Sequence, residues 1–221
     1  AKIVLTAAFL WCIPILLLTF SLGWQHAYTQ MAWFFTKAAL LTFGGAYAVL
    51  PYVYQGAVNY YGWLNPTQMI DGLALGESTP GPLIMVVAFV GFLGGFNQAL
   101  LGTEHLFLAG AVGAVIVTWF TFLFSFVFIF AGAPLIESTH NELRFTAPLT
   151  AISAAVVGVI LNLALFFSYH VLWPNGFDHA FNYEAAIITV AAMIALFKFQ
   201  INVLYVIFAS AVCGLILYLF V

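Results

Sequence analysis

Long apolar runs separated by short polar stretches are the dominant pattern along this chain of 221 residues. A helix needs about 20 apolar residues to cross the hydrocarbon core of a bilayer, which is roughly 30 Å thick. Runs of this kind predict transmembrane helices over residues 1–22, 106–131, 145–170, 185–197 and 201–221. The fourth run is short, and a tight turn would pair it with the last. The pattern predicts one transmembrane domain over residues 1–221, an all-α integral membrane protein with about five spans.

Residues 33–97 show a different pattern, because polar and helix-breaking residues interrupt their apolar runs. In the first half of this region, Ala32 to Thr42 is compatible with a helix and is apolar apart from Lys37. Gly44 and Gly45 interrupt it, since adjacent glycines remove the side-chain constraint on the backbone. Ala46 to Tyr61 can be helical again. The first segment therefore predicts two short helices around a glycine break.

The second half repeats this layout. Pro66 to Ser78 reads as a helix with proline at its first position. The sequence Thr-Pro-Gly-Pro at residues 79–82 interrupts it, and Leu83 to Phe96 can form the next apolar helix. Neither part is long enough to span a bilayer comfortably. Each segment is expected to be a re-entrant helical hairpin, or a span broken at its middle.

Breaks of this kind are costly in lipid, because freed backbone groups need partners that hydrocarbon does not supply. They are tolerated where they are buried in protein or line a cavity. Each break also creates a helix N-terminus, with free N–H groups and a partial charge of about +0.5, which favours anions. The new helices would start near Gly45 and near Pro82. The pattern predicts an anion site within the membrane; the alternative is that the glycines and prolines serve close packing or kinks.

Two charged residues lie close to the breaks. Lys37 is costly inside a membrane and would mark a substrate pathway, unless its side chain reaches the headgroups. Glu77 directly precedes the second break, where it could carry a proton, pair with Lys37, or end a solvated helix. Lys37 is thus a candidate substrate contact and Glu77 a candidate coupling residue.

Composition agrees with a membrane protein and excludes several other classes. Only 5% of the residues are charged and 65% are hydrophobic, whereas soluble domains average about 25% charged residues. The net charge is −3 and the chain has four Lys and Arg residues, too few to bind nucleic acid. Cys12 and Cys213 lie far apart, and no metal, cofactor or nucleophile motif is recognised. We therefore expect neither an enzyme nor a cofactor.

The two interrupted segments carry a resemblance to a known family. The stretches "FTKAALLTFGGAYAVLP", which ends at Pro51, and "DGLALGESTPGPLIMVVAFVGF", which begins at Asp71, are similar to the chromate ion transporter family. Its members share an F-x-K-x-G/A-x-x-T/S-F-G-G-x-x-A-x-x-P block and a P-G-P block. The likeness covers roughly Phe34 to Gly95. Ala39 stands where many members have glycine, which loosens the inference about helix packing there.

The resemblance implies a function and a set of substrate residues. Members of this family move chromate and sulfate, many contain two homologous halves, and others are short and act as pairs. This chain is similar to the C-terminal half of a two-half member, and it begins with alanine rather than methionine, which suggests part of a longer polypeptide. The substrate region implied by the likeness consists of Lys37, Phe43, Gly44, Gly45, Pro51, Pro80, Gly81 and Pro82.

The sequence as a whole predicts secondary active transport of a tetrahedral oxyanion, chromate or sulfate, across a bacterial-type cell membrane. Alternating access generally uses two repeats around a midplane site, and each block occurs once here. We therefore expect a homologous N-terminal half or a second subunit as partner, besides membrane lipid. The alternative is a non-transporting membrane subunit that scaffolds a complex.

Overall fold

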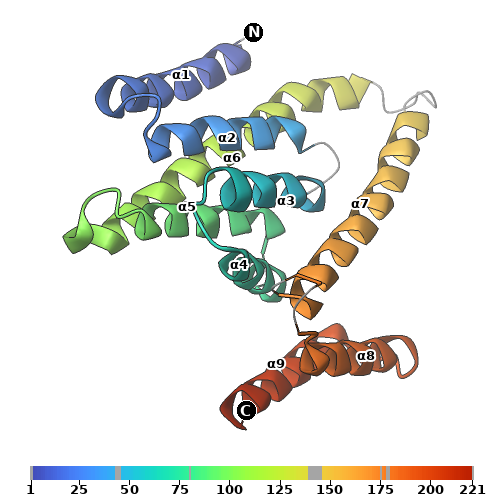
Figure 1. Ribbon diagram of the computed structural model, residues 1–221. Coiled ribbons are helices and arrows are strands. Elements are labelled where there is room, and N and C mark those ends of the chain that lie inside the picture. Colours follow the sequence, from blue (N-terminus) through green and yellow to red (C-terminus); the bar gives the residue numbers. More distant parts are fainter. Residues whose placement is uncertain are drawn as a thin grey trace. The chain divides into compact units, whose positions relative to one another are not determined.

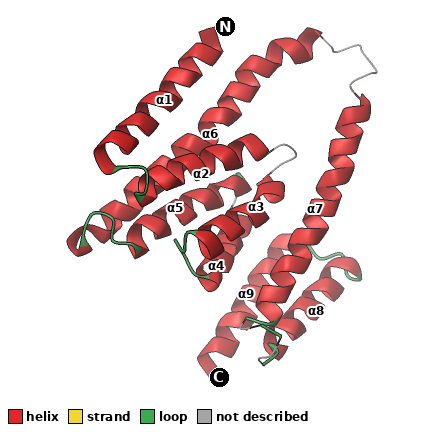
Figure 2. Ribbon diagram, turned by 45° about the horizontal axis from the view of Figure 1, so that its top comes forward, coloured by secondary structure: helices red, strands yellow, loops and turns green. Residues whose placement is uncertain are grey.

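A computed structural model describes residues 2–42, 46–79, 81–138, 146–174, 176–177 and 180–220, and its regular elements in these ranges are all helical (Figures 1 and 2). The α-helices are α1 (Lys2–Leu22), α2 (Ala27–Leu41), α3 (Ala46–Tyr54), α4 (Pro66–Ser78), α5 (Val86–Asn97), α6 (Leu106–Ser138), α7 (Thr146–Leu172), α8 (Tyr183–Phe197) and α9 (Val203–Phe220). Shorter turns are the π-helical η1 (Gln55–Tyr60) and the 3₁₀-helical η2 (Leu83–Met85) and η3 (Thr103–His105).

Within the described ranges, three helical segments are long and apolar enough to cross a membrane, namely Ile3–Leu22, Thr103–Gly132 and Ala154–Leu172. Three shorter apolar helices cover Leu83–Asn97, Tyr183–Phe197 and Val203–Leu217. The structure thus confirms the all-helical class with long apolar helices, as a multi-pass membrane protein requires. The predicted number of about five spans and the re-entrant hairpins stay predictions.

The chain divides into two compact units, Ala1–Leu163 and Ala164–Val221. In the first unit, α5 and α2 both pack against α6, and the three helices lie side by side (Figure 1). A core cluster joins α1, α2 and α6 through Ile15, Ala32 and Phe120, with Trp11 and Trp33 at its edge. Helix α6 is therefore the central support of this unit, the helix against which α2 of the first interrupted segment and α5 of the second both pack.

Glycines bring α5 and α6 into backbone contact. A Cβ atom at Gly91 would lie 2.6 Å from the carbonyl oxygen of Gly113, and one at Gly113 would collide with the Gly91 carbonyl in turn. A Cβ atom at Gly95 would collide with the backbone of Ala109. Small residues of this kind let membrane helices approach closely and pack by van der Waals contact. These glycines lie within ordinary apolar runs, so the sequence alone did not indicate this role.

Three hydrogen bonds from aromatic side chains fasten α1 and α2 to their neighbours. The hydroxyl of Tyr28 on α2 donates to the carbonyl of Ala109 on α6 over 2.8 Å, and Tyr28 is buried. Trp119 Nε1 on α6 donates to the Leu10 carbonyl on α1 over 3.2 Å. A third bond, of 3.0 Å, runs from Trp11 Nε1 to Thr36 Oγ1 and joins α1 to α2. These bonds tie the helix that carries Lys37 to the central support.

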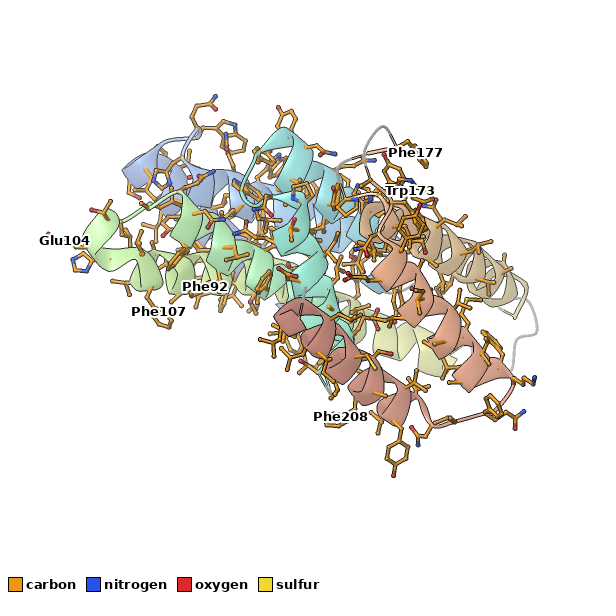
Figure 3. The ribbon with its side chains drawn as sticks, turned by 60° about the horizontal axis from the view of Figure 1, so that its bottom comes forward. Phe92, Glu104, Phe107, Trp173, Phe177 and Phe208 are labelled. Atoms are coloured by element: carbon orange, nitrogen blue, oxygen red, sulfur yellow. The ribbon has the colours of Figure 1, made fainter. Side chains whose placement is uncertain are left out.

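The turn between α5 and α6 contains the acidic residue Glu104. Figure 3 shows Glu104 at the far end of this turn, with Phe107 at the start of α6 and Phe92 further along α5. The rings of the two phenylalanines meet edge to face with their centroids 5.5 Å apart. Phe107 is 74% exposed, so this apolar surface needs lipid or protein cover.

The second unit contains the end of α7 and the pair α8 and α9. Trp173 after α7 contacts the rings of Phe177 and Phe181, each with a centroid distance of 4.9 Å. The turn at residues 198–202 then joins α8 to α9, and Asn202 caps α9 by accepting a hydrogen bond from the backbone N–H of Leu204. The last helix therefore begins at Val203, inside the run predicted over residues 201–221.

Candidate functional site

The first interrupted segment forms two separate helices. Helix α2 ends at Leu41, and Thr42 closes it through its backbone N–H, which donates to Ala39, and its hydroxyl, which donates to Ala38. Helix α3 begins at Ala46. The predicted substrate residues Phe43, Gly44 and Gly45 lie between them, outside the described residues. The separation of the two helices agrees with the predicted interruption.

Aromatic packing fixes α3 and η1 against α2. The ring of Phe34 stacks on Tyr52 with a centroid distance of 4.8 Å and an interplanar angle of 11°. The same ring meets Trp63 edge-on at 5.6 Å. A Cβ atom at Gly56 would collide with the Phe34 ring, so glycine is needed there for π-helical η1 to lie on α2. π-Helical turns are often found at functional sites, and this one follows the helix that starts after the glycine pair.

The second interrupted segment begins with a helix of the predicted extent. Asn65 accepts a hydrogen bond from the Gln68 N–H over 2.8 Å, and the Gln68 side chain accepts one from the Asn65 N–H. This capping box, followed by Pro66, fixes the start of α4. The helix ends at Ser78, where the hydroxyl and N–H of Thr79 both donate to the Leu75 carbonyl. Local chemistry therefore determines both ends of α4.

The chain after the break differs in detail from its prediction. Pro80 lies outside the described residues, and Pro82 is extended, with φ −69° and ψ 121°. Leu83 to Met85 form a 3₁₀ turn, so the α-helix expected from Leu83 starts only at Val86. The reason is the extended Pro82, whose carbonyl accepts the Met85 N–H over 2.9 Å and so closes a tighter turn.

A cavity of about 200 Å³ lies at this break, between α4, η2 and α5. One water takes up about 30 Å³ of liquid, so the cavity is large enough for a small solute. Gly81 and Pro82, two of the residues predicted to contact substrate, border it together with Thr79. A Cβ atom at Gly81 would meet nothing within 4 Å. The other lining residues are Gly72, Leu75, Gly76, Met85, Val86 and Phe89.

The two candidate charges have different partners. The Nζ atom of half-buried Lys37 lies 6.0 Å from the centroid of the Trp33 ring, one turn earlier on α2, at the distance of a cation–π contact. Trp33 in turn contacts Trp11 and Trp24, with centroid distances of 6.3 and 5.9 Å. The exposed carboxylate of Glu77 accepts a hydrogen bond of 3.2 Å from the hydroxyl of Tyr47. The structure thus records these contacts in place of the Lys37–Glu77 pair considered from the sequence.

Tyr47 is a candidate that the sequence analysis missed. It lies in the first turn of α3, directly after the glycine break, and its hydroxyl reaches the last turn of α4. The two interrupted segments therefore touch through polar groups. A tyrosine just after a glycine pair is the only local signal, and its partner depends on how the two segments pack. Among the residues that the structure describes, no three His, Cys, Asp or Glu side chains are grouped to hold a metal ion.

Known proteins share sequence similarity with this chain. The sequence profile of the family described as chromate transporter matches residues 29–215. The chromate transport protein of Pseudomonas aeruginosa is 39% identical over 124 residues, which is 56% of this chain and 26% of that protein. That of Cupriavidus metallidurans is 32% identical over 132 residues, which is 60% of this chain and 29% of that protein.

A relative of different length also matches. The uncharacterized transporter YwrA of Bacillus subtilis is 25% identical over 192 residues, which is 85% of this chain and 94% of that protein. The chain therefore spans less than a third of the two chromate transport proteins but nearly all of this shorter relative. No solved structure gives a significant match.

Proposed function

We propose that this chain, which belongs to the chromate transporter family, forms all or part of a transporter that carries chromate or sulfate across a bacterial cell membrane. The observation that carries the proposal is the cavity at the second break, because Gly81 and Pro82 of the family-like block line it. Two relatives are chromate transport proteins, and the described part of the chain has three long apolar helices; both observations support the proposal.

In this proposal, backbone N–H groups and one lysine bind the oxyanion. Helix α3 begins just after the glycine pair and the η2 turn just after Pro82, so both breaks precede a new helical N-terminus. Free N–H groups and the positive end of the helix dipole favour an anion there. Lys37 would add a full positive charge. The proposed substrate residues are Lys37, Phe43, Gly44, Gly45, Pro80, Gly81 and Pro82.

Transport is proposed to be secondary active, with Glu77 as the group that carries a coupling proton. An ionisable residue within a membrane segment commonly marks a proton or ion pathway. Glu77 lies beside Gly76, which borders the cavity, and its carboxylate is exposed. Proton uptake by Glu77 would therefore change the charge close to the proposed site.

A partner is proposed because the chain holds one copy of each block. Transporters with alternating access generally use two repeats around a central site. One relative is matched over nearly its full length, which fits a partner supplied by a second subunit. Two relatives are matched over less than a third of their length, which fits a partner supplied by a homologous half of the same polypeptide.

Uptake of labelled chromate and sulfate into vesicles that contain the protein tests the proposal. We expect Lys37→Ala to raise the half-saturating oxyanion concentration roughly ten- to a hundredfold, which corresponds to one charged hydrogen bond. Glu77→Gln should abolish the dependence of uptake on a proton gradient, and Gly45→Leu should block uptake. Lys198→Ala, in the turn after α8, is the matched control and should leave uptake unchanged. Oxyanion flux that is the same in all these variants would remove the proposed site.

A second candidate function is a membrane scaffold without transport. It is favoured by the glycines of α5 and α6, which serve packing rather than a ligand. Thermal unfolding of the purified protein separates the two functions. A ligand at 100 times its Kd stabilises a protein by about 2.7 kcal/mol, so chromate should raise the unfolding temperature of a transporter and leave that of a scaffold unchanged.

A further inference from the structure

Tyr47 and Glu77 form a hydrogen bond between the two interrupted segments. The tyrosine hydroxyl donates to the Glu77 Oε2 atom over 3.2 Å, and the two residues are 30 positions apart. Tyr47 is the second residue of α3, and Glu77 is the last residue but one of α4. The bond thus joins the chain just after the first break to the chain just before the second.

The first turn of α3 lacks one of its own helical hydrogen bonds. Pro51 lies within α3 and has no backbone N–H. The carbonyl of Tyr47 therefore cannot accept the usual helical hydrogen bond from the residue four positions later. Val49 and Leu50 are buried and hold the middle of the helix. The side chain of Tyr47 gives the first turn a polar attachment outside its own helix.

The hydrogen bond also stabilises the ionised Glu77 side chain. It lies in the last turn of α4, where the free carbonyl groups carry partial negative charge and disfavour a carboxylate. A hydroxyl that donates to an ionised oxygen offsets this, since hydrogen bonds to charged acceptors are stronger than those between neutral groups. Its neighbours Gly76 and Thr79 border the cavity at the second break. The orientation of the Glu77 carboxylate is thereby set next to the proposed substrate site.

We infer that Tyr47 is a positioning residue that orients the Glu77 carboxylate and holds the first turn of α3 to the end of α4. The bond would thus couple the start of α3 to the end of α4. The consequence for transport rests on the proposed function, whereas the bond and its effect on local structure do not.

Two measurements on the full chain in detergent, without substrate, test the inference. Hydrogen exchange reports opening of α3 and of the last turn of α4. We expect Tyr47→Phe to speed exchange there roughly three- to tenfold, the change that one net hydrogen bond gives, with unchanged exchange in α5 and α6. Tyr52→Phe is the matched control, because Tyr52 lies in α3 like Tyr47 and its ring stacks on Phe34 of α2.

Infrared spectroscopy reports the carboxylate itself. The chain has seven Asp and Glu residues, so the difference between the wild type and Glu77→Gln isolates the Glu77 stretching band. This band should shift in Tyr47→Phe and stay in place in Tyr52→Phe. A purely structural role of Tyr47 would leave the band unmoved.

A double variant makes the test stricter. In the Glu77→Ala background, Tyr47→Phe should no longer speed exchange, because the bond that it would remove is already absent. Exchange and band position that match the wild type in Tyr47→Phe, or effects that add in the double variant, would overturn the inference. Neither measurement uses substrate, so a protein that fails to carry chromate leaves this test intact.

Discussion

The glycines of the α5–α6 interface and the glycine of the second break serve different physical ends. Gly91, Gly95 and Gly113 leave no room for a Cβ atom, because the backbone of the facing helix occupies its place. A Cβ atom at Gly81 would face open space, with nothing within 4 Å. Close packing explains the first three glycines but not the fourth. We infer from this difference that Gly81 leaves the cavity at the second break accessible, whereas the other three glycines allow close contact between two helices.

The largest effect on stability is expected at the α5–α6 interface. Gly113→Ala places a methyl group against the Gly91 carbonyl, and backbone cannot move aside as a flexible side chain could. Overpacking of this kind costs about 1–3 kcal/mol. Unfolding of the detergent-solubilised protein by heat or denaturant measures the loss.

Gly132→Ala is the matched control on the same helix, since nothing lies within 4 Å of a Cβ atom there. In a helix, alanine is favoured over glycine by roughly 0.5–1 kcal/mol, so this variant should be as stable as the wild type or more so. Equal stabilities for Gly113→Ala and Gly132→Ala would contradict the packing role.

A smaller effect is expected from the bond that holds α2 to the same interface. Tyr28→Phe removes the hydroxyl that donates to the Ala109 carbonyl, and with it this hydrogen bond between α2 and α6. One net hydrogen bond contributes about 0.5–1.5 kcal/mol. The same unfolding measurement applies, with Tyr60→Phe as control because that side chain is 80% exposed. If Tyr28→Phe unfolds like Tyr60→Phe, the bond does not support α2.

The sequence predicted best where local chemistry decides the structure. The bounds of α4, Pro66 to Ser78, agree with the prediction because a proline at the first turn and the Thr-Pro-Gly-Pro stretch mark its two ends. The long apolar helices were likewise predicted from composition and length alone. The 3₁₀ turn after Pro82 was not, since the start of a helix after proline depends on the backbone angles of that residue.

Contacts between segments could not be predicted in the same way. The glycine interface requires knowledge of which helices face each other, and a glycine in an apolar run does not reveal its neighbour. The bond from Tyr47 to Glu77 likewise depends on how α3 meets α4. The contact of Lys37 with Trp33 was accessible from the sequence, because residues four apart on a helix are neighbours.

The smallest effect on stability and a large effect on transport are expected together at Gly81. Gly81→Ala adds a methyl group in open space, so the unfolding free energy should stay within about 0.5 kcal/mol of the wild type. The same methyl group would project at the edge of the cavity and keep an oxyanion from the backbone, and a loss of about 1.4 kcal/mol in binding corresponds to tenfold weaker half-saturation. Chromate uptake in vesicles, measured beside unfolding of the same preparation, gives both quantities. If Gly81→Ala has normal uptake and normal stability, Gly81 does not keep the cavity accessible. If the variant loses stability, Gly81 serves packing, as the glycines of the α5–α6 interface do.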